Sequence, residues 1–182
     1  MSDSSHINTF FIPDNGMFPN NDILPLVLMK QAFDPTEKNL VRSIEKTFQT
    51  NAWGRSWRNG IYSFHHYHSS AHEVLGLYSG WVKVRFGGPG GPAVSAKNGD
   101  VIVVPAGVSH KNLAQSPDFR CVGAYPQGQS PDMQYGKSGE RPQTDRNIRS
   151  VPLPARDPVG GKNGPLLKIW GQRHQLPERP SP

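Results

Sequence analysis

The chain has 182 residues, of which 35 % are hydrophobic, and it contains 19 glycines and 18 prolines. Such a composition favours short strands joined by many turns over a helical bundle. The formal net charge is +6, and +5 of it comes from residues 137–182, where nine Lys or Arg stand against four Asp or Glu. That region is rich in proline and shows no recognition-helix pattern, so we expect a solvated basic arm and no nucleic-acid partner.

Membrane-spanning and secreted proteins are also disfavoured. No apolar run approaches about 18 residues, the length of a spanning helix, and residues 1–16 lack the basic and apolar segments of a secretory leader. Cys121 is the only cysteine, which excludes an intrachain disulfide and fits a reducing compartment, so we expect a cytoplasmic protein. Because Cys121 lies in the apolar run FRCVGAY, we interpret it as a buried, inert thiol.

Residues 1–33 are predicted to form an extended arm. Its apolar runs FFIPDNG and LPLVLMKQAF are broken by Pro, Asn and Gly, which is typical of edge strands. Residues 34–56 are predicted to hold one helix, at about 36–50, that packs on the strands that follow. Asp34 suits the N-cap, Pro35 the first helical position and Glu37 a capping box. Helical spacing then places four apolar residues on one face: Leu40, Val41, Ile44 and Phe48.

Residues 57–125 show the period-two pattern of strands. The candidates are separated by Gly, Pro and Asn-Gly every eight to twelve residues, which predicts an all-β antiparallel sandwich or barrel. They are GIYSFHHYH, HEVLGLYSG, WVKVRFGG, DVIVVPAGVSH and FRCVGAY.

The C-terminal segment, residues 126–182, is rich in Gly, Pro and Arg. Only residues 164–171, GPLLKIWG, have the apolar density to dock on the strands, and the tail HQLPERPSP is predicted to be disordered. Residues 125–146 could form a lid over the strands, although their composition favours disorder.

Four of the seven histidines lie within SFHHYHSSAHEV, residues 63–74. In a strand, His66 and His68 face the same side, whereas His65 faces the other. After a turn at SSA, Glu73 begins the next strand and can return beside the two imidazoles. Two imidazoles and a carboxylate form an open metal site, and His110, after a Pro-Ala-Gly turn, offers a further ligand.

Two spaced motifs carry a resemblance to a known family. The first is Gly60, five residues, His66, one residue, His68, four residues, Glu73, six residues, Gly80; the second is Gly99, five residues, Pro105, one residue, Gly107, two residues, His110. They resemble the two motifs of the cupin superfamily, with all nine fixed positions filled. One departure is Ala114, where an asparagine is common; that position does not bind metal. The whole chain is similar to the single-domain bacterial, RmlC-like cupins of the YjlB type.

This resemblance implies a small antiparallel β-barrel or jelly roll that holds one divalent transition metal (Fe, Mn, Ni or Zn). The implied ligands are His66, His68, Glu73 and His110. It also implies turn glycines at positions 60, 80, 99 and 107, where tight turns between short strands favour positive φ. Cupins of this kind often pair through edge strands and swapped arms, so we expect a homodimer.

Several neighbouring residues have a structural interpretation beside the functional one. By strand parity His65 and His72 face away from the ligands, and we interpret them as exterior histidines, with an outer role around the metal as the alternative. Tyr62 and Phe64 share the ligand face one layer away. Packing in the core is the default for these two rings, and lining a substrate pocket is the alternative.

Three functions remain open, because a fold does not settle function. The first is a metal-dependent enzyme on a small molecule: a dioxygenase acting on a chelated substrate, which we favour slightly, or an isomerase or lyase that uses the metal as Lewis acid. In either case Glu73 is the candidate catalytic base. The second is a non-catalytic cupin that binds or senses a small ligand. The third, a metal-free storage barrel, is disfavoured by the complete ligand set.

Overall fold

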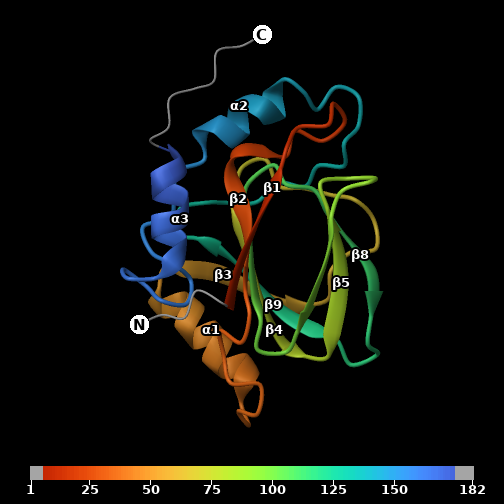
Figure 1. Ribbon diagram of the computed structural model, residues 1–182. Coiled ribbons are helices and arrows are strands. Elements are labelled where there is room, and N and C mark those ends of the chain that lie inside the picture. Colours follow the sequence, from red (N-terminus) through yellow and green to blue (C-terminus); the bar gives the residue numbers. More distant parts are fainter. Residues whose placement is uncertain (1–5, 175–182) are drawn as a thin grey trace.

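The computed structural model describes residues 6–174. Nine strands form two antiparallel sheets that stack face to face (Figure 1). The larger sheet has the order β1 (Ile7–Ile12), β2 (Asn21–Met29), β7 (Val101–Val104), β4 (Glu73–Ser79), β9 (Arg120–Pro126), β3 (Trp53–Asn59). The smaller sheet has the order β6 (Ala93–Lys97), β5 (Trp81–Phe86), β8 (His110–Gln115). The predicted antiparallel jelly-roll class is confirmed, but the two sheets do not close into a barrel.

The core between the sheets follows the alternation of the strands. Leu75 and Leu77 of β4 point inward and meet Val82 and Val84 of β5, all of them fully buried. Val74, between Glu73 and Leu75, points to the opposite face of the larger sheet. Glu73 therefore shares the inner face with the two leucines, as the period-two reading predicts.

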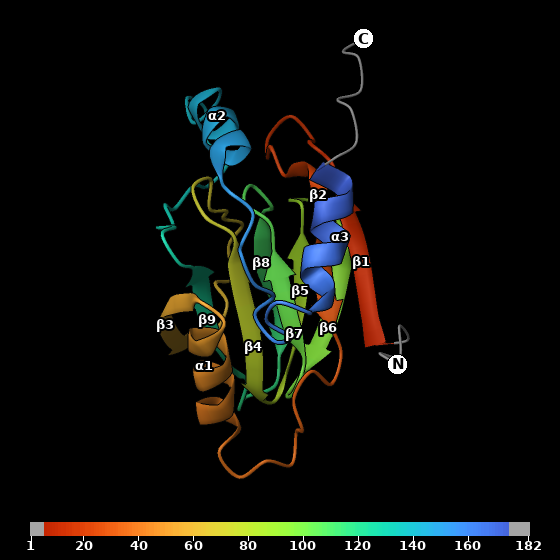
Figure 2. The same cartoon turned by 90° about the vertical axis from the view of Figure 1, so that its left-hand side faces the viewer.

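Helices cover the outer face of the larger sheet (Figure 2). Helix α1 (Leu40–Thr50) buries Leu40, Ile44 and Phe48 on the predicted stripe. Helix α3 (Pro165–His174) adds Leu166 and Trp170 to the same outer core. Because this face is apolar and covered, both faces of the central strands are buried, and strands β7 and β9 read as nearly continuous apolar runs.

Helix α1 begins later than expected. Asp34 does not cap it: its carboxylate accepts hydrogen bonds from the Thr36 amide and hydroxyl, which closes a separate turn. The helix starts at Leu40, after Asn39, whose side chain makes no capping bond within the described chain. The sequence predicted that Asp34 caps the helix, but in the structure the Asp34 side chain closes a turn that precedes the helix.

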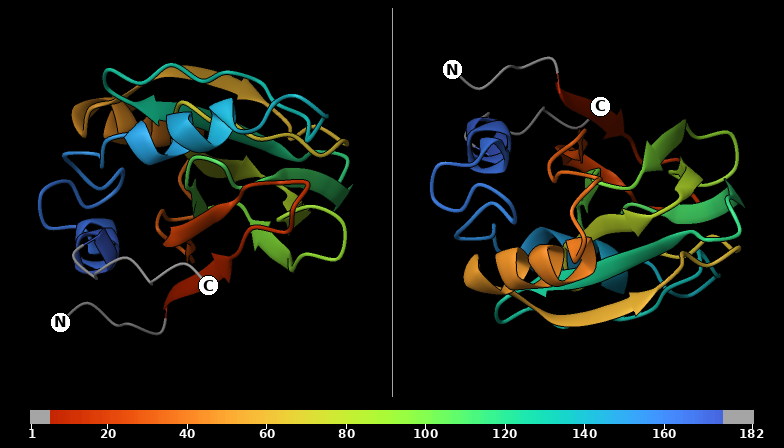
Figure 3. Two further views of the ribbon diagram at one scale, coloured as in Figure 1. Left: turned by 90° about the horizontal axis from the view of Figure 1, so that it is seen from above. Right: turned by 90° about the horizontal axis from the view of Figure 1, so that it is seen from below.

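The arms are also more ordered than predicted. Strand β1 is an edge strand, but β2 lies between β1 and β7 and is therefore interior. The proline in β2, Pro25, lies at the irregularity in the register between β1 and β2, where a missing N–H is tolerated, and its carbonyl accepts the Trp170 indole N–H at 3.0 Å. The C-terminal segment adds two helices to the one predicted. Helix α2 (Gln143–Ser150) lies across one end of the sandwich (Figure 3), and the predicted disordered tail, apart from His174, falls outside the described residues.

No helix of residues 6–174 is long and apolar enough to cross a membrane. Cys121 is fully buried, and burial raises the pKa of its thiol far above the ordinary value. Its interpretation as an inert core residue is therefore confirmed. Of the four predicted turn glycines, Gly80, Gly99 and Gly107 have positive φ, whereas Gly60 does not.

Candidate metal centre

His66 and His68 lie in a segment that is not a strand. Residues 60–68 were predicted to form a strand, but only isolated bridges form there. His66 exchanges two backbone hydrogen bonds with His110, at 3.2 and 2.9 Å, and Tyr67 exchanges two with Gln134, at 2.9 and 3.0 Å. The segment is thereby held on one side by the start of β8 and on the other by the C-terminal segment. The alternation of residues in this segment predicted a strand. Its actual partners, His110 and Gln134, lie more than 40 residues later in the chain, so the sequence did not reveal the pairing.

The alternation itself holds in this clamped segment. His66 and His68 line one cavity, together with Glu73 at the start of β4 and His110 at the start of β8. Tyr67, between the two histidines, points the other way, is fully buried and donates its hydroxyl to Glu140 at 2.9 Å. The structure thus brings together all four side chains that the motifs single out.

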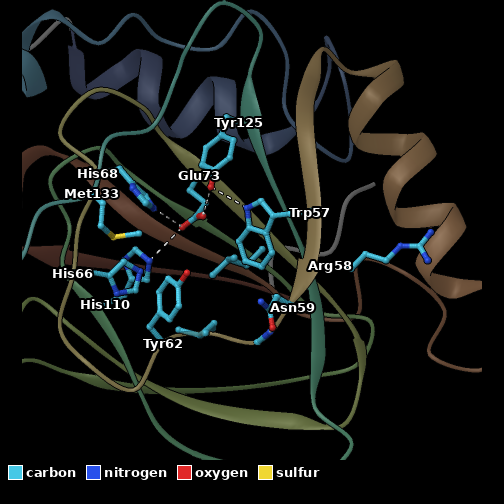
Figure 4. Close-up of a pocket in the computed structure, with 13 residues that line it drawn as sticks. Trp57, Arg58, Asn59, Tyr62, His66, His68, Glu73, His110, Tyr125 and Met133 are labelled. Atoms are coloured by element: carbon cyan, nitrogen blue, oxygen red, sulfur yellow. Dashed lines mark hydrogen bonds and ion pairs between the residues drawn. The ribbon is translucent and has the colours of Figure 1, made fainter.

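The four side chains are buried and close (Figure 4). The ring nitrogens available as ligands on His66, His68 and His110 all lie within 4.8 Å of one another. The Oε2 atom of Glu73 lies 3.3 Å from Nε2 of His110 and 3.6 Å from Nε2 of His68. A single ion placed among these atoms would contact donors from three separate parts of the chain.

Each of the three imidazoles is fixed in one tautomer by its backbone neighbour. Nδ1 of His66 lies 3.1 Å from the Phe64 carbonyl, and Nδ1 of His110 lies 3.1 Å from the Val108 carbonyl. Nδ1 of His68 contacts the Asp132 carbonyl. A carbonyl oxygen only accepts, so each Nδ1 carries a proton, and a neutral ring of this tautomer has its lone pair on Nε2. Three imidazoles whose ligand nitrogens lie within 4.8 Å of one another can share one metal ion.

The two carboxylate oxygens of Glu73 have different surroundings. Its Oε1 accepts the Tyr125 hydroxyl at 3.2 Å, and that hydroxyl accepts the Trp57 indole N–H at 2.9 Å. Its Oε2, directed at the histidines, is buried and has no hydrogen-bond partner among the described residues. A buried carboxylate oxygen without a partner is costly, so this atom calls for a cation.

Electrostatics agree with an ionised carboxylate. Burial alone would raise the pKa of Glu73, but the imidazoles of His68 and His110 hold it well below the ordinary value. Burial alone would lower the pKa of His68, but the charge of Glu73 raises it. Burial, with the neighbouring His110, lowers the pKa of His66 to about 3. Three imidazole nitrogens and one carboxylate form a donor set that fits a divalent transition metal such as iron, manganese, nickel or zinc.

A cavity of about 330 Å³ opens in front of this cluster. Tyr62 lines it, whereas Phe64 does not; Phe64 instead stacks on Tyr62 with ring centroids 4.8 Å apart. The two side chains are 51 % and 43 % exposed, so the default expectation that they pack in the core is wrong. The remaining walls come mainly from Trp57, Asn59, Ile61, Leu75, Tyr125 and Met133.

Tyr125 and Trp57 were not singled out from the sequence. A signal for Tyr125 existed, because parity along FRCVGAY places it on the same face as Cys121. The register pairs Val74 with Ala124, which sets Tyr125 across from Glu73. For Trp57 the sequence carried no such signal, since its position depends on the register between β3 and β9.

His72 is not the exterior residue that parity suggested. It is 1 % exposed, accepts the Ala106 amide on Nδ1 at 2.9 Å and lies against the Trp170 ring, with centroids 4.7 Å apart. Parity did place it on the face away from the ligands, but α3 covers that face. His65 is half-buried beside Phe18, with ring centroids 5.6 Å apart.

The segment after β9 forms part of the site, although its composition favoured disorder. The Asp132 carboxylate accepts the amides of Ser69 and Ser70 at 2.6 and 3.2 Å, beside His68. Met133, the next residue, reaches the cavity. The contacts that order this segment are made to residues more than 60 positions earlier, which composition does not reveal.

Comparison with known proteins places the chain. The uncharacterized protein YjlB of Bacillus subtilis is 43 % identical over 162 residues, which cover 89 % of this chain and 95 % of that protein. No family model matches.

Solved structures give weaker likenesses. An acireductone dioxygenase from Bacillus anthracis, with cadmium in its active centre, is 14 % identical with a TM-score of 0.43, covering 59 % of this chain and 82 % of that one. The epimerase RmlC of Legionella pneumophila is 16 % identical with a TM-score of 0.38, covering 81 % and 85 %. The assignment rests instead on the YjlB relative, the two motifs and the stacked antiparallel sheets. The chain belongs to the YjlB family of single-domain, RmlC-like cupins.

Proposed function

We propose that the protein is a metal-dependent cupin enzyme that acts on a small molecule. His66, His68, Glu73 and His110 would hold one divalent transition metal at the bottom of the cavity. The observation that supports this most directly is the meeting of three tautomer-fixed imidazoles with a buried carboxylate oxygen that has no other partner.

The chain's own groups define what the site can do. When bound, such an ion supplies a Lewis acid or, if it is redox-active, an electron-transfer centre with positions open to a substrate. The carbonyl contacts keep the three imidazoles oriented, and Tyr125 fixes the second oxygen of Glu73. Glu73 is the only carboxylate among the described residues that line the cavity. A proton taken up there by a carboxylate therefore goes to Glu73.

Oxygenase chemistry is slightly favoured because it needs the fewest acid–base groups in the cavity. A second candidate is an isomerase or lyase, and the Glu73–Tyr125 contact favours it. Burial and the charge of Glu73 raise the pKa of Tyr125, so its phenol stays protonated, and the hydroxyl and the carboxylate form a hydrogen-bonded pair through which a proton could move. A third candidate is a cupin that binds or senses a small ligand without turnover.

Elemental analysis tests the metal site. Protein purified without an affinity tag is expected to contain about one metal ion per chain, and His66→Ala/His68→Ala is expected to contain none. His65→Ala is the matched control, because His65 lies in the same segment but outside the cavity. Wild-type metal content in the double variant would remove the proposed site.

Turnover separates the three candidates. Substrate-dependent oxygen uptake by the metal-loaded protein supports the oxygenase, and conversion of a substrate without oxygen supports the isomerase or lyase. If metal is bound but a panel of chelating substrates gives neither, the binding or sensing role takes precedence.

The homodimer and the cytoplasmic location are part of the proposal. Edge strand β1 offers a face for pairing with a second copy, and the single cysteine suits a reducing compartment. A monomeric mass by light scattering at micromolar concentration would argue against the dimer.

A further inference from the structure

The walls of the cavity indicate what kind of molecule fits it. From the cavity lining we infer that the substrate is a flat aromatic molecule without a charged tail, bound through a small chelating head group. This inference rests on the proposed metal site and names the substrate class for it. Its support comes from three features of the lining: the rings beside the ligands, the absence of a free cation, and an exposed aromatic ledge at the mouth.

Aromatic rings stand next to the ligands. The rings of Tyr62, Trp57 and Tyr125 border the space beside the histidines and Glu73 (Figure 4). Tyr62 meets His66 edge-on, with centroids 5.2 Å apart. The indole of Trp57 lies over Gly123, where an added Cβ would come within 2.1 Å of the ring. Glycine at this position allows the indole to lie close against the strand and leaves its other side toward the cavity.

No free positive charge faces the cavity. Arg58 is the only Lys or Arg among the described lining residues, and its guanidinium points away from the other lining residues (Figure 4). Two of its nitrogens donate to the Glu45 carboxylate at 2.6 and 2.7 Å. Phosphate and carboxylate groups are usually bound by Arg or Lys. A substrate with such a group inside the cavity would therefore find no cationic partner among the described lining residues, since the Lys137 ammonium lies outside the cavity, over the Tyr135 ring.

An exposed ledge of aromatic rings continues outward from the cavity. Tyr62 and Phe64 are stacked nearly parallel, with an interplanar angle of 19°. The ring centroids of Phe64 and Tyr135 lie 6.0 Å apart. Tyr62, Phe64 and Tyr135 are each more than 40 % exposed. The ammonium of Lys137 covers the Tyr135 ring at 4.9 Å. Large exposed rings that adjoin a cavity are typical of a binding surface, and these stacked rings suit a flat aromatic molecule.

Hydroxamates test this inference, because one head group can carry different tails. Zinc-loaded protein, its metal content checked by elemental analysis, would be titrated calorimetrically with benzohydroxamate, acetohydroxamate and 4-carboxybenzohydroxamate. We expect benzohydroxamate to bind about tenfold more tightly than acetohydroxamate, from the apolar area of its ring. The added carboxylate is expected to weaken binding.

Variants of Tyr62 locate the effect. Tyr62→Ala is expected to weaken benzohydroxamate roughly two- to tenfold, the range for one aromatic pair, and to leave acetohydroxamate unchanged. Tyr62→Phe is expected to keep wild-type affinity. Trp81→Ala, which removes an exposed ring that does not line the cavity, serves as the control.

The outcomes separate the inference from the proposed function. Equal affinity for the phenyl and methyl hydroxamates, or tighter binding of the carboxylate form, would overturn the aromatic substrate class while leaving the metal site intact. Zinc-loaded protein that binds none of the three would overturn it as well. Failure to take up zinc would instead contradict the proposed function itself.

Discussion

Replacing Glu73 with glutamine should stabilise the metal-free protein and reduce the stability that metal adds. In the metal-free protein, Oε2 of Glu73 is a buried, charged atom without a hydrogen bond. An amide nitrogen in its place can donate to Nε2 of His110, 3.3 Å away, while Oε1 keeps its bond to Tyr125. At a pH where the neighbouring imidazoles are neutral and no longer compensate the carboxylate, the variant removes a buried charge and satisfies an orphan position, so its free energy of unfolding should rise by about 1–3 kcal/mol.

With metal the variant loses at least about 1.3 kcal/mol of this advantage. At metal concentrations about a hundredfold above Kd, the wild type gains about 2.7 kcal/mol. Losing the ligand charge should weaken binding by at least about tenfold, since even outer partners of a metal site are worth that much. Glu73→Gln should then gain at most about 1.4 kcal/mol from the same metal.

Urea unfolding at pH 8, in EDTA and in excess zinc, measures both effects. Glu45→Gln is the control, because that carboxylate pairs with Arg58 on the surface. If Glu73→Gln lowers stability in EDTA, then Glu73 is already compensated without metal and the argument from its orphaned oxygen is refuted. If zinc stabilises the variant as much as the wild type, Glu73 is not a ligand.

Three further changes test the packing around the site. Trp170→Ala should lower the free energy of unfolding by about 3–5 kcal/mol, because the ring is 1 % exposed; equal urea midpoints for this variant and Trp81→Ala would show that α3 is not docked. Gly123→Ala should cost about 1–3 kcal/mol and weaken zinc binding, since the new Cβ displaces Trp57. Unchanged unfolding and zinc titration curves would contradict that. Burial lowers the pKa of His72 to about 3, so between about pH 6.5 and pH 3 only the unfolded state takes up this proton. The contribution of His72 to stability in EDTA should therefore be full above pH 6.5 and fall by about 2 kcal/mol by pH 5, in addition to a similar contribution from His66. His72→Gln should show a shallower decline, and an equal decline would assign the effect to other groups.

The sequence by itself determined the spacing of the motifs and the alternation of the strands. Both are local properties, because side-chain direction in an extended segment depends only on parity. Parity alone placed His66 with His68, and Glu73 on the inner face of its strand. The buried stripe of α1 likewise followed from helical spacing. Positive φ at Gly80 and Gly99 agrees with the tight turns expected there.

Only the tertiary structure decided which surfaces are covered and which groups support the ligands. Parity placed His72 on the face away from the ligands. Helix α3, about a hundred residues later in the chain, covers that face and buries His72. The contact of Asp132 with Ser69 holds in place the segment after β9, whose composition predicted disorder. The pairing of β4 with β9 placed Tyr125 beside Glu73. Burial and hydrogen bonding between distant segments depend on the whole packing, and no local pattern in a single sequence encodes them.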